Sequence, residues 1–207
     1  MKTREWRQYL ETQNGLHGKN IFTVTELANV AGTSLNVLNV ELSRLRKYGL
    51  IERYAQGKYG LPSTLTAEIL LPTIDSRAYI TGTYALHYHQ LITQVPTRIT
   101  CFTNRRHNRS RERLTPVGRY TFVCVSASVY SPPESGVIAT PEQALYDFIY
   151  LMRRHGVKPE TLVTFRNLHK IRNTYLSRIV SRYPDTVRKH LQEILKRKQS
   201  DFLRKIN

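Results

Sequence analysis

The residues whose types most often do chemistry are few and poorly spaced for it. His87 and His89 stand two positions apart, so their imidazoles face different directions on a helix, whereas a helical zinc pair needs a spacing of four. Cys101 and Cys124 are too few for a disulfide scaffold or a four-thiolate zinc site. Each lies in an expected strand, where a thiol packs as a small apolar group. We therefore expect no metal and no other cofactor.

Carboxylates also fail to form a catalytic pattern. Glu142 and Asp147 are five residues apart, which puts them on different faces of the helix predicted around them. The chain has no glycine-rich phosphate loop, nucleophile elbow or kinase motif. We expect a binding protein with no catalytic residues. A nucleic-acid enzyme, whose carboxylates would meet only in the fold, stays open as an alternative.

Net charge is the strongest functional signal. Lys and Arg total 32 against 15 Asp and Glu, a net +17 with a pI near 10.2. Basic side chains outnumber acidic ones by nine to five over residues 1–65, by eight to six over 66–150 and by fifteen to four over 151–207. A field of this sign attracts polyanions, and we expect nucleic acid first. An acidic protein or an anionic membrane surface would satisfy the same charge.

Apolar content bounds the class of protein. Hydrophobic residues make up 40% of the chain, enough for a core, and no apolar run approaches the ~20 residues that span a bilayer. The first seven residues, MKTREWR, carry charges where a secretion signal needs an apolar stretch. We expect a cytoplasmic protein without a membrane partner.

A helix-turn-helix pattern occupies the first third. Thr23 and Glu26 form a capping box, with Glu26 reaching back, at the start of a helix from Val24 to Ala31 that Gly32 ends. A second helix, capped by Thr33 or Ser34, runs to about Tyr48 before Gly49. Its apolar stripe, at spacings of three and four, is Leu35, Leu38, Leu42 and Leu45.

The elements around these helices predict a winged helix. Residues 50–54 alternate as a strand, 55–58 turn, and 59–62 return as a second strand. An earlier helix, from Thr3 to about Gln13 and ended by Gly15, would pack Trp6 and Leu10 against the pair. A plain protein-binding module of the same shape is the alternative.

The side chains opposite the leucines of the second helix are short, polar or basic, as suits a helix in a DNA major groove. The residues we expect to contact DNA are Thr33, Ser34, Asn36, Val40, Ser43, Arg44 and Lys47, with Gln56 and Lys58 at the hairpin tip.

Strands and an arginine-rich loop follow. We expect strands over 77–81, 98–103 and 119–130, and a helix after Gly82, capped by Thr83 and reaching Leu91. The loop between the last two strands suits phosphate contacts, because arginine offers forked donors. A merely solvated face is the alternative. The residues concerned are Arg105, Arg106, Arg109, Arg111 and Arg113.

The remaining chain predicts helices. Thr140 caps one helix, with Pro141 in its first turn and Gln143 completing a capping box; within it, Asp147 is either buried or faces a partner. A second helix covers about 162–179, and a basic amphipathic helix follows Tyr183-Pro184-Asp185. The predicted fold class is α+β, with a winged helix-turn-helix domain over 1–65 and a mixed helix–sheet domain over 66–207.

Three segments resemble the AbiEi family of antitoxins from abortive-infection toxin–antitoxin systems, which are also transcriptional repressors. They are GKYGLP at 57–62, YITGTYALHYH at 79–89 and VIATPEQALYD at 137–147, within a resemblance that covers about residues 20–150. Where the family often has glycine after the second segment this chain has Gln90, so the exit of that helix is expected to differ.

The resemblance implies a winged helix that binds operator DNA and a C-terminal region that neutralises a nucleotidyltransferase-like toxin. A stand-alone winged-helix transcription factor would share the DNA-binding half without a toxin. A protein-binding adaptor would keep the helices but lack DNA affinity.

Overall fold

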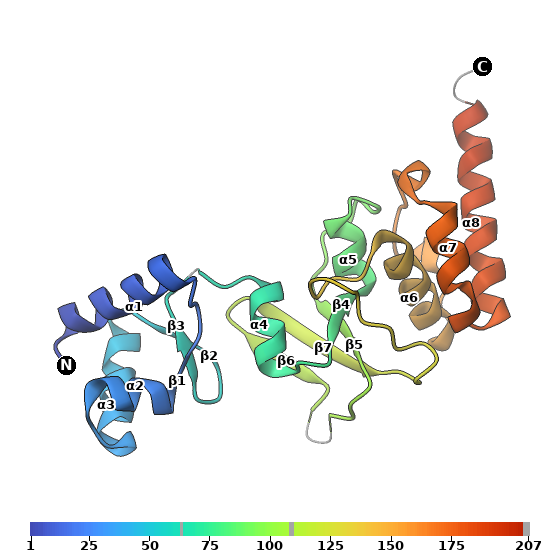
Figure 1. The fold of residues 1–207 in the computed structure, drawn as a ribbon. Coiled ribbons are helices and arrows are strands. Elements are labelled where there is room, and N and C mark those ends of the chain that lie inside the picture. The colour runs from blue at the N-terminus through green and yellow to red at the C-terminus, as the bar shows by residue number, and fades with distance from the viewer. Residues whose placement is uncertain (63, 108–109, 205–207) are drawn as a thin grey trace. The chain divides into compact units, whose positions relative to one another are not determined.

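The computed structural model describes residues 1–62, 64–107 and 110–204, with side chains as far as Lys196. The fold is a mixture of helices and sheets, as the α+β prediction requires. The chain forms two compact units (Figure 1). The first comprises Met1–Ile74 with Leu114–Val117, and the second comprises Asp75–Arg113 and the chain from Gly118 onward. The division therefore falls after Ile74, beyond the sequence-derived boundary at residue 65.

The first unit packs helices around a small antiparallel sheet of strand order β1-β3-β2. Phe22 of β1 and Arg53 of β2 both pair with Tyr59 of β3. Its core joins Trp6 and Leu10 to the buried side of the next two helices. The elements are α1 (Thr3–His17), β1 (Phe22–Thr23), α2 (Val24–Ala31), α3 (Leu35–Lys47), β2 (Glu52–Ala55), β3 (Lys58–Gly60) and α4 (Ala67–Ile74).

Local signals set most of these helix ends. Thr23 Oγ1 accepts from the Glu26 N–H at 3.1 Å, which confirms the cap, and Gly32 ends α2 with a left-handed φ of 61°. The prediction that Glu26 reaches back to complete the capping box is wrong, because the Glu26 carboxylate binds Lys19 Nζ at 2.5 Å instead. The expected stop of α1 at Gly15 is also wrong, since the helix continues to His17 before Gly18.

The second unit is built on a sheet of strand order β4-β5-β7-β6. β4 and β5 are antiparallel, whereas β5 and β7 run parallel, with Ile99 opposite Tyr120. The strands are β4 (Tyr79–Thr81), β5 (Ile99–Thr103), β6 (Glu112–Thr115) and β7 (Gly118–Cys124). The helices are α5 (Gly82–Tyr88), α6 (Pro141–Arg154), α7 (Asn173–Ile179) and α8 (Asp185–Arg204), with short 3₁₀ turns at Pro159–Thr161, Leu168–Lys170 and Val180–Arg182.

Helices α5 and α6 pack against each other beside this sheet, and α8 packs against α6. Phe148 and Ile149 of α6 lie in the centre of the core, and α8 adds Val187, Leu191 and Ile194 to it. The start of α8 is therefore part of the core of the unit rather than a detached basic helix.

Several expected elements of the second unit are wrong in extent. The strand expected over 119–130 ends at Cys124, because the chain turns where Tyr130 N–H bonds the Ser126 carbonyl at 2.9 Å. The helix expected over 162–179 is broken into 3₁₀ turns and α7, and Asn167 has a φ of 55°. Helix α5 starts at Gly82 after Thr81, not after Thr83, and stops at Tyr88 instead of reaching Leu91.

Candidate nucleic-acid interface

Helix α3 has one buried side and one open side. Leu38, Leu42 and Leu45 are almost completely buried in the core of the first unit, as the stripe predicts. The prediction for Leu35 is wrong: its side chain remains 48% exposed. Burial of three leucines fixes the rotation of the helix, so the opposite side is held toward solvent. Because α3 is rigidly seated, its outer side chains start from defined positions.

The structure places most of the residues proposed to contact DNA on this open side. Those of α3 are all exposed, and Val40 keeps 74% of its surface, enough for an apolar contact with a thymine methyl group. Exposed members of the set are Ser34, Asn36, Val40, Ser43, Arg44, Lys47 and Gln56, whereas Thr33 and Lys58 are half-buried.

Ser34 occupies the N-cap of α3, but its side chain makes no capping hydrogen bond. Its hydroxyl is therefore available, within the described residues, for a contact outside the helix. The Thr33 N–H is used locally, since it donates to the Ala28 carbonyl at 3.2 Å and closes the turn between α2 and α3. Thr33 therefore helps to fix the turn before α3, and its half-buried side chain offers little surface to DNA.

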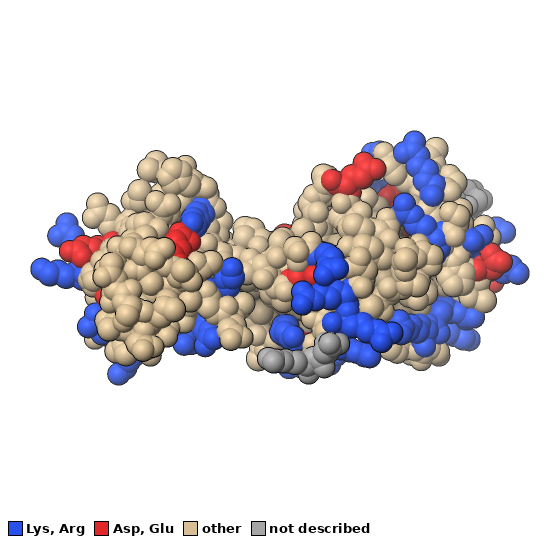
Figure 2. All heavy atoms as spheres, turned by 60° about the horizontal axis from the view of Figure 1, so that its bottom comes forward, with Lys and Arg blue, Asp and Glu red and all other residues tan. Residues whose placement is uncertain are grey.

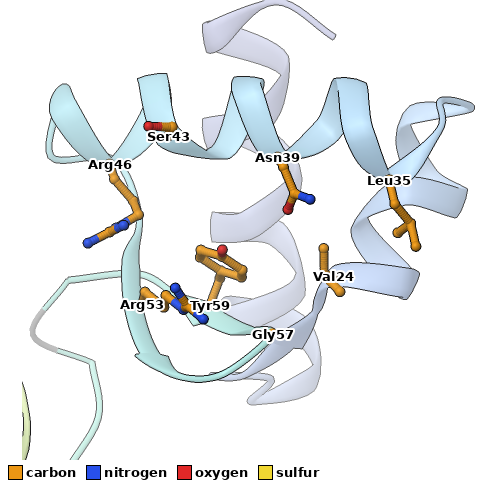
Figure 3. Close-up of a pocket in the computed structure, with 8 residues that line it drawn as sticks. All are labelled: Val24, Leu35, Asn39, Ser43, Arg46, Arg53, Gly57 and Tyr59. Atoms are coloured by element: carbon orange, nitrogen blue, oxygen red, sulfur yellow. The ribbon is translucent and has the colours of Figure 1, made fainter.

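A groove of about 440 Å³ lies between α3 and the β2–β3 hairpin (Figure 3). Asn39 and Arg46 project into it from the helix, and Arg53 and Tyr59 approach from the strands. The turn of the hairpin closes one side, where Gly57 takes a left-handed φ of 65°. The residues lining the groove are Val24, Leu35, Asn39, Ser43, Arg46, Arg53, Gly57 and Tyr59.

A second hollow of about 510 Å³ shares Ser43 and Arg46 with this groove and is also lined by Lys47 and Glu52. The polar surface therefore continues past the C-terminal end of α3. Both hollows are open, and the groove between α3 and the hairpin is mainly polar, which suits an extended charged partner better than a small apolar ligand.

Asn39, Arg46 and Arg53 were missed at the sequence level. A signal for two of them was present, because Asn39, Ser43 and Arg46 recur at spacings of four and three and so form one ridge of α3. Arg53 carried no such signal. The pairing register shifts between Arg53 and Ala55, an irregularity of the hairpin that residue types alone do not reveal.

The charged residues that line the two hollows are mainly basic, and Glu52 in the second hollow is the carboxylate among them. Among the described residues, Arg46, Lys47 and Arg53 form no ion pair with a carboxylate. Arg44 does have one, since its guanidinium lies 3.9 Å from Glu41 Oε1. A phosphate would therefore find three unpaired cations beside α3, while Arg44 must exchange a weak intrahelical pair for a DNA contact.

The arginine-rich loop is only partly available for phosphate. Arg105, Arg106 and Arg111 are exposed. The loop prediction is wrong for Arg113, which lies in strand β6, is half-buried and donates to the Ser110 and Glu112 carbonyls. Arg109 lies outside the described residues. Figure 2 shows a band of Lys and Arg side chains across the displayed face of the second unit.

A buried aspartate anchors the start of this loop. His107 Nε2 lies 2.9 Å from Asp75 Oδ2, and its ring stacks on Phe122 at a centroid distance of 4.4 Å. Asp75 also accepts from the Thr103 hydroxyl at 2.8 Å and from the Arg77 N–H at 3.0 Å. Burial raises the pKa of Asp75, but these hydrogen bonds outweigh it, so the pKa lies below its ordinary value.

A second buried aspartate, Asp147, lies at the centre of the second unit. It accepts hydrogen bonds from three hydroxyls: Tyr183 at 2.7 Å, Thr81 at 2.8 Å and Tyr79 at 3.1 Å. Complete burial raises the pKa of Asp147 to about 7, although all three hydrogen bonds oppose the shift. Of the two alternatives for Asp147, burial is correct, and its contacts are structural.

The remaining candidate chemistry is also used internally. His89 Nε2 lies 2.8 Å from the Ala139 carbonyl, and Cys101 is fully buried, which raises the pKa of its thiol. Over residues 1–62, 64–107 and 110–196, no three His, Cys, Asp or Glu side chains lie close enough together to hold a metal ion. Within the described helices, none has both the length and the apolar character to cross a membrane.

No protein-family model matches this chain, and a search of curated proteins finds no match either.

Proposed function

We propose that the first unit is a winged helix that binds double-stranded DNA, with α3 in the major groove and the β2–β3 hairpin against the backbone beside it. The observation that carries the proposal is the open polar side of α3 next to a cationic groove. Asn36 and Arg44 are suited to base edges, and Arg46 and Arg53 to phosphates.

The separate roles of base-contacting and phosphate-contacting residues can be tested by selecting binding sites from a random duplex pool with the full chain. Asn36→Ala is expected to relax the preference at one base position, because an amide reads adenine through two hydrogen bonds. Arg53→Ala is expected to weaken binding to all sequences equally, because a phosphate contact carries no sequence information. A pool that yields no preferred sequence would contradict specific DNA binding.

We further propose that the chain represses transcription and acts as an antitoxin against a nucleotidyltransferase-like toxin. This part rests on the resemblance to the AbiEi family. In this chain the second and third resembling segments pack together as α5 and α6, and His89 bonds the Ala139 carbonyl between them. Since Ala85, Leu86 and Leu145 are buried, these segments shape the core, and a toxin would have to bind other side chains of the unit.

Co-expression with the neighbouring gene tests the antitoxin role. A chain carrying Asn36→Ala and Arg44→Ala is expected to protect cells while losing repression. Replacing exposed arginines of the second unit with uncharged residues is expected to abolish protection and to leave repression intact. A neighbouring gene whose product is harmless would leave the alternative, a stand-alone winged-helix transcription factor.

A further inference from the structure

A basic surface around α7 is separate from the groove of the first unit. Residues 161–184 contain no Asp or Glu and five Lys or Arg. All five are exposed: Arg166, Lys170, Arg172, Arg178 and Arg182. None forms an ion pair with a described carboxylate. Arg182 interacts electrostatically with the buried Asp147, and the excess of positive charge in this segment favours binding of a polyanion.

An aromatic ring lies in the middle of this surface. Tyr175 is 42% exposed on α7. The Arg172 and Arg178 guanidinium carbons lie 5.5 Å and 5.4 Å from the centre of its ring. Tyr175 and Arg178 are three residues apart on α7, and Arg172 is the residue just before its first turn, so the three side chains lie together along this short segment. We call Arg172, Tyr175 and Arg178 the α7 ridge.

Contacts to the rest of the unit hold the ridge in place. The Arg172 N–H donates to the buried Glu142 carboxylate of α6 at 3.0 Å, which fixes the start of α7. Leu176, next to Tyr175, is buried in the core. Cation–π contacts to one ring restrict both guanidinium groups, so binding costs less side-chain entropy.

We propose that the α7 ridge binds single-stranded nucleic acid. Arginine forks hold phosphates, and a guanidinium that already lies over the Tyr175 ring can stack its outer flat face on an unpaired base, so that ring, guanidinium and base form one stack. An acidic protein segment would satisfy the charge but would not stack on the flat guanidinium faces that lie over the Tyr175 ring. A duplex would also satisfy the charge, but its bases are stacked on one another and cannot stack on Tyr175.

Binding of the full chain to a fluorescent oligouridine of about 12 nucleotides tests this assignment. Tyr175→Ala is expected to weaken binding by about 5- to 100-fold, while Tyr175→Phe keeps wild-type affinity, because stacking needs the ring and not the hydroxyl. Arg172→Ala with Arg178→Ala is expected to lower the salt slope by about 0.7 for each phosphate that is no longer neutralised. Thermal unfolding of each variant checks that the second unit remains folded.

Arg153→Ala with Arg154→Ala is the matched control, since it removes the same charge from exposed positions outside the ridge. The control pair is expected to cost much less affinity than the ridge pair. Equal reductions from the two pairs, or no effect of Tyr175→Ala, would overturn the proposal. So would an equal dependence on Tyr175 for a duplex, or a ridge that binds polyglutamate and not the oligonucleotide. Asn36→Ala with Arg44→Ala should leave the effect of Tyr175→Ala unchanged, which separates this site from the DNA-binding proposal.

Discussion

The Tyr183 hydroxyl donates a 2.7 Å hydrogen bond to Asp147 Oδ1, which joins the segment before α8 to the buried side of α6. Thr81 and Tyr79 of β4 donate to the other oxygen of the same carboxylate. One side chain therefore links three segments that lie far apart in the sequence. The same burial that permits these bonds disfavours the charged carboxylate and raises its pKa.

This arrangement predicts that the second unit is less stable in mildly alkaline than in mildly acidic solution. The pKa of Asp147 is about 7 in the folded chain against an ordinary 3.8, so its contribution is fully present below the ordinary value and is lost as the pH rises through 7. Linkage gives a decrease of about 2–3 kcal/mol in the free energy of unfolding between about pH 5 and about pH 8. Urea unfolding across this range measures it, and Asp147→Asn should remove most of the dependence. A pH-independent wild type would contradict the explanation.

Asp75 predicts the opposite dependence at low pH. Because its pKa lies below the ordinary value, its contribution is present at neutral pH and is lost as the pH falls below 3.8. Asp75→Ala would leave the Thr103 hydroxyl and the Arg77 N–H without their acceptor, at an expected cost of about 2–4 kcal/mol. Asp75→Asn retains an acceptor and should cost less. Unfolding curves that coincide for Asp75→Ala and wild type would refute this role.

The cap of α6 gives a prediction about stability alone. Thr140 Oγ1 accepts from the Gln143 N–H at 3.3 Å. Thr140→Ala is expected to cost roughly 1 kcal/mol, and Thr140→Ser is expected to keep most of the stability. Calorimetry on the two variants measures the difference. If Thr140→Ala also changed DNA affinity at a temperature where it is fully folded, the cap would have a further role.

Local features of the fold could be predicted from the sequence. Thr23, Gly32 and Thr140 act through bonds or backbone angles within a few residues, and all three were placed correctly. The buried face of α3 followed from periodicity, because Leu38, Leu42 and Leu45 share one side of the helix. The winged-helix assignment and its DNA contacts remain predictions.

Features that depend on distant partners could not be predicted in the same way. The Asp147 hydroxyl partners come from β4 and from the segment before α8, so no spacing near Asp147 reveals them. Leu35 continues the leucine stripe in sequence, yet it lines the groove because the hairpin lies beside the start of α3. The left-handed Gln90 is a related case: its carbonyl accepts from Asn167 at 2.9 Å, a contact made across the fold.

We expect the basic residues of α8 to contribute to DNA affinity through phosphate contacts that do not depend on the DNA sequence. Truncation after residue 184 would remove the buried Val187, Leu191 and Ile194, so charge substitution is the better test. Lys189→Gln with Lys196→Gln, both exposed, is expected to reduce the salt slope of duplex binding by up to about 0.9 for each phosphate that these lysines neutralise. An unchanged slope would assign these side chains to a different partner.

The central claim is that the open side of α3 binds duplex DNA, and the most direct test is the affinity of the full chain for its selected duplex. Asn36→Ala with Arg44→Ala is expected to weaken binding by about 1–3 kcal/mol for each base that these two side chains read. The matched pair Arg7→Ala with Gln8→Ala removes the same charge from exposed positions of α1 and should change affinity little. If the α3 pair binds as tightly as wild type, or if both pairs weaken binding equally, α3 does not read DNA in this protein.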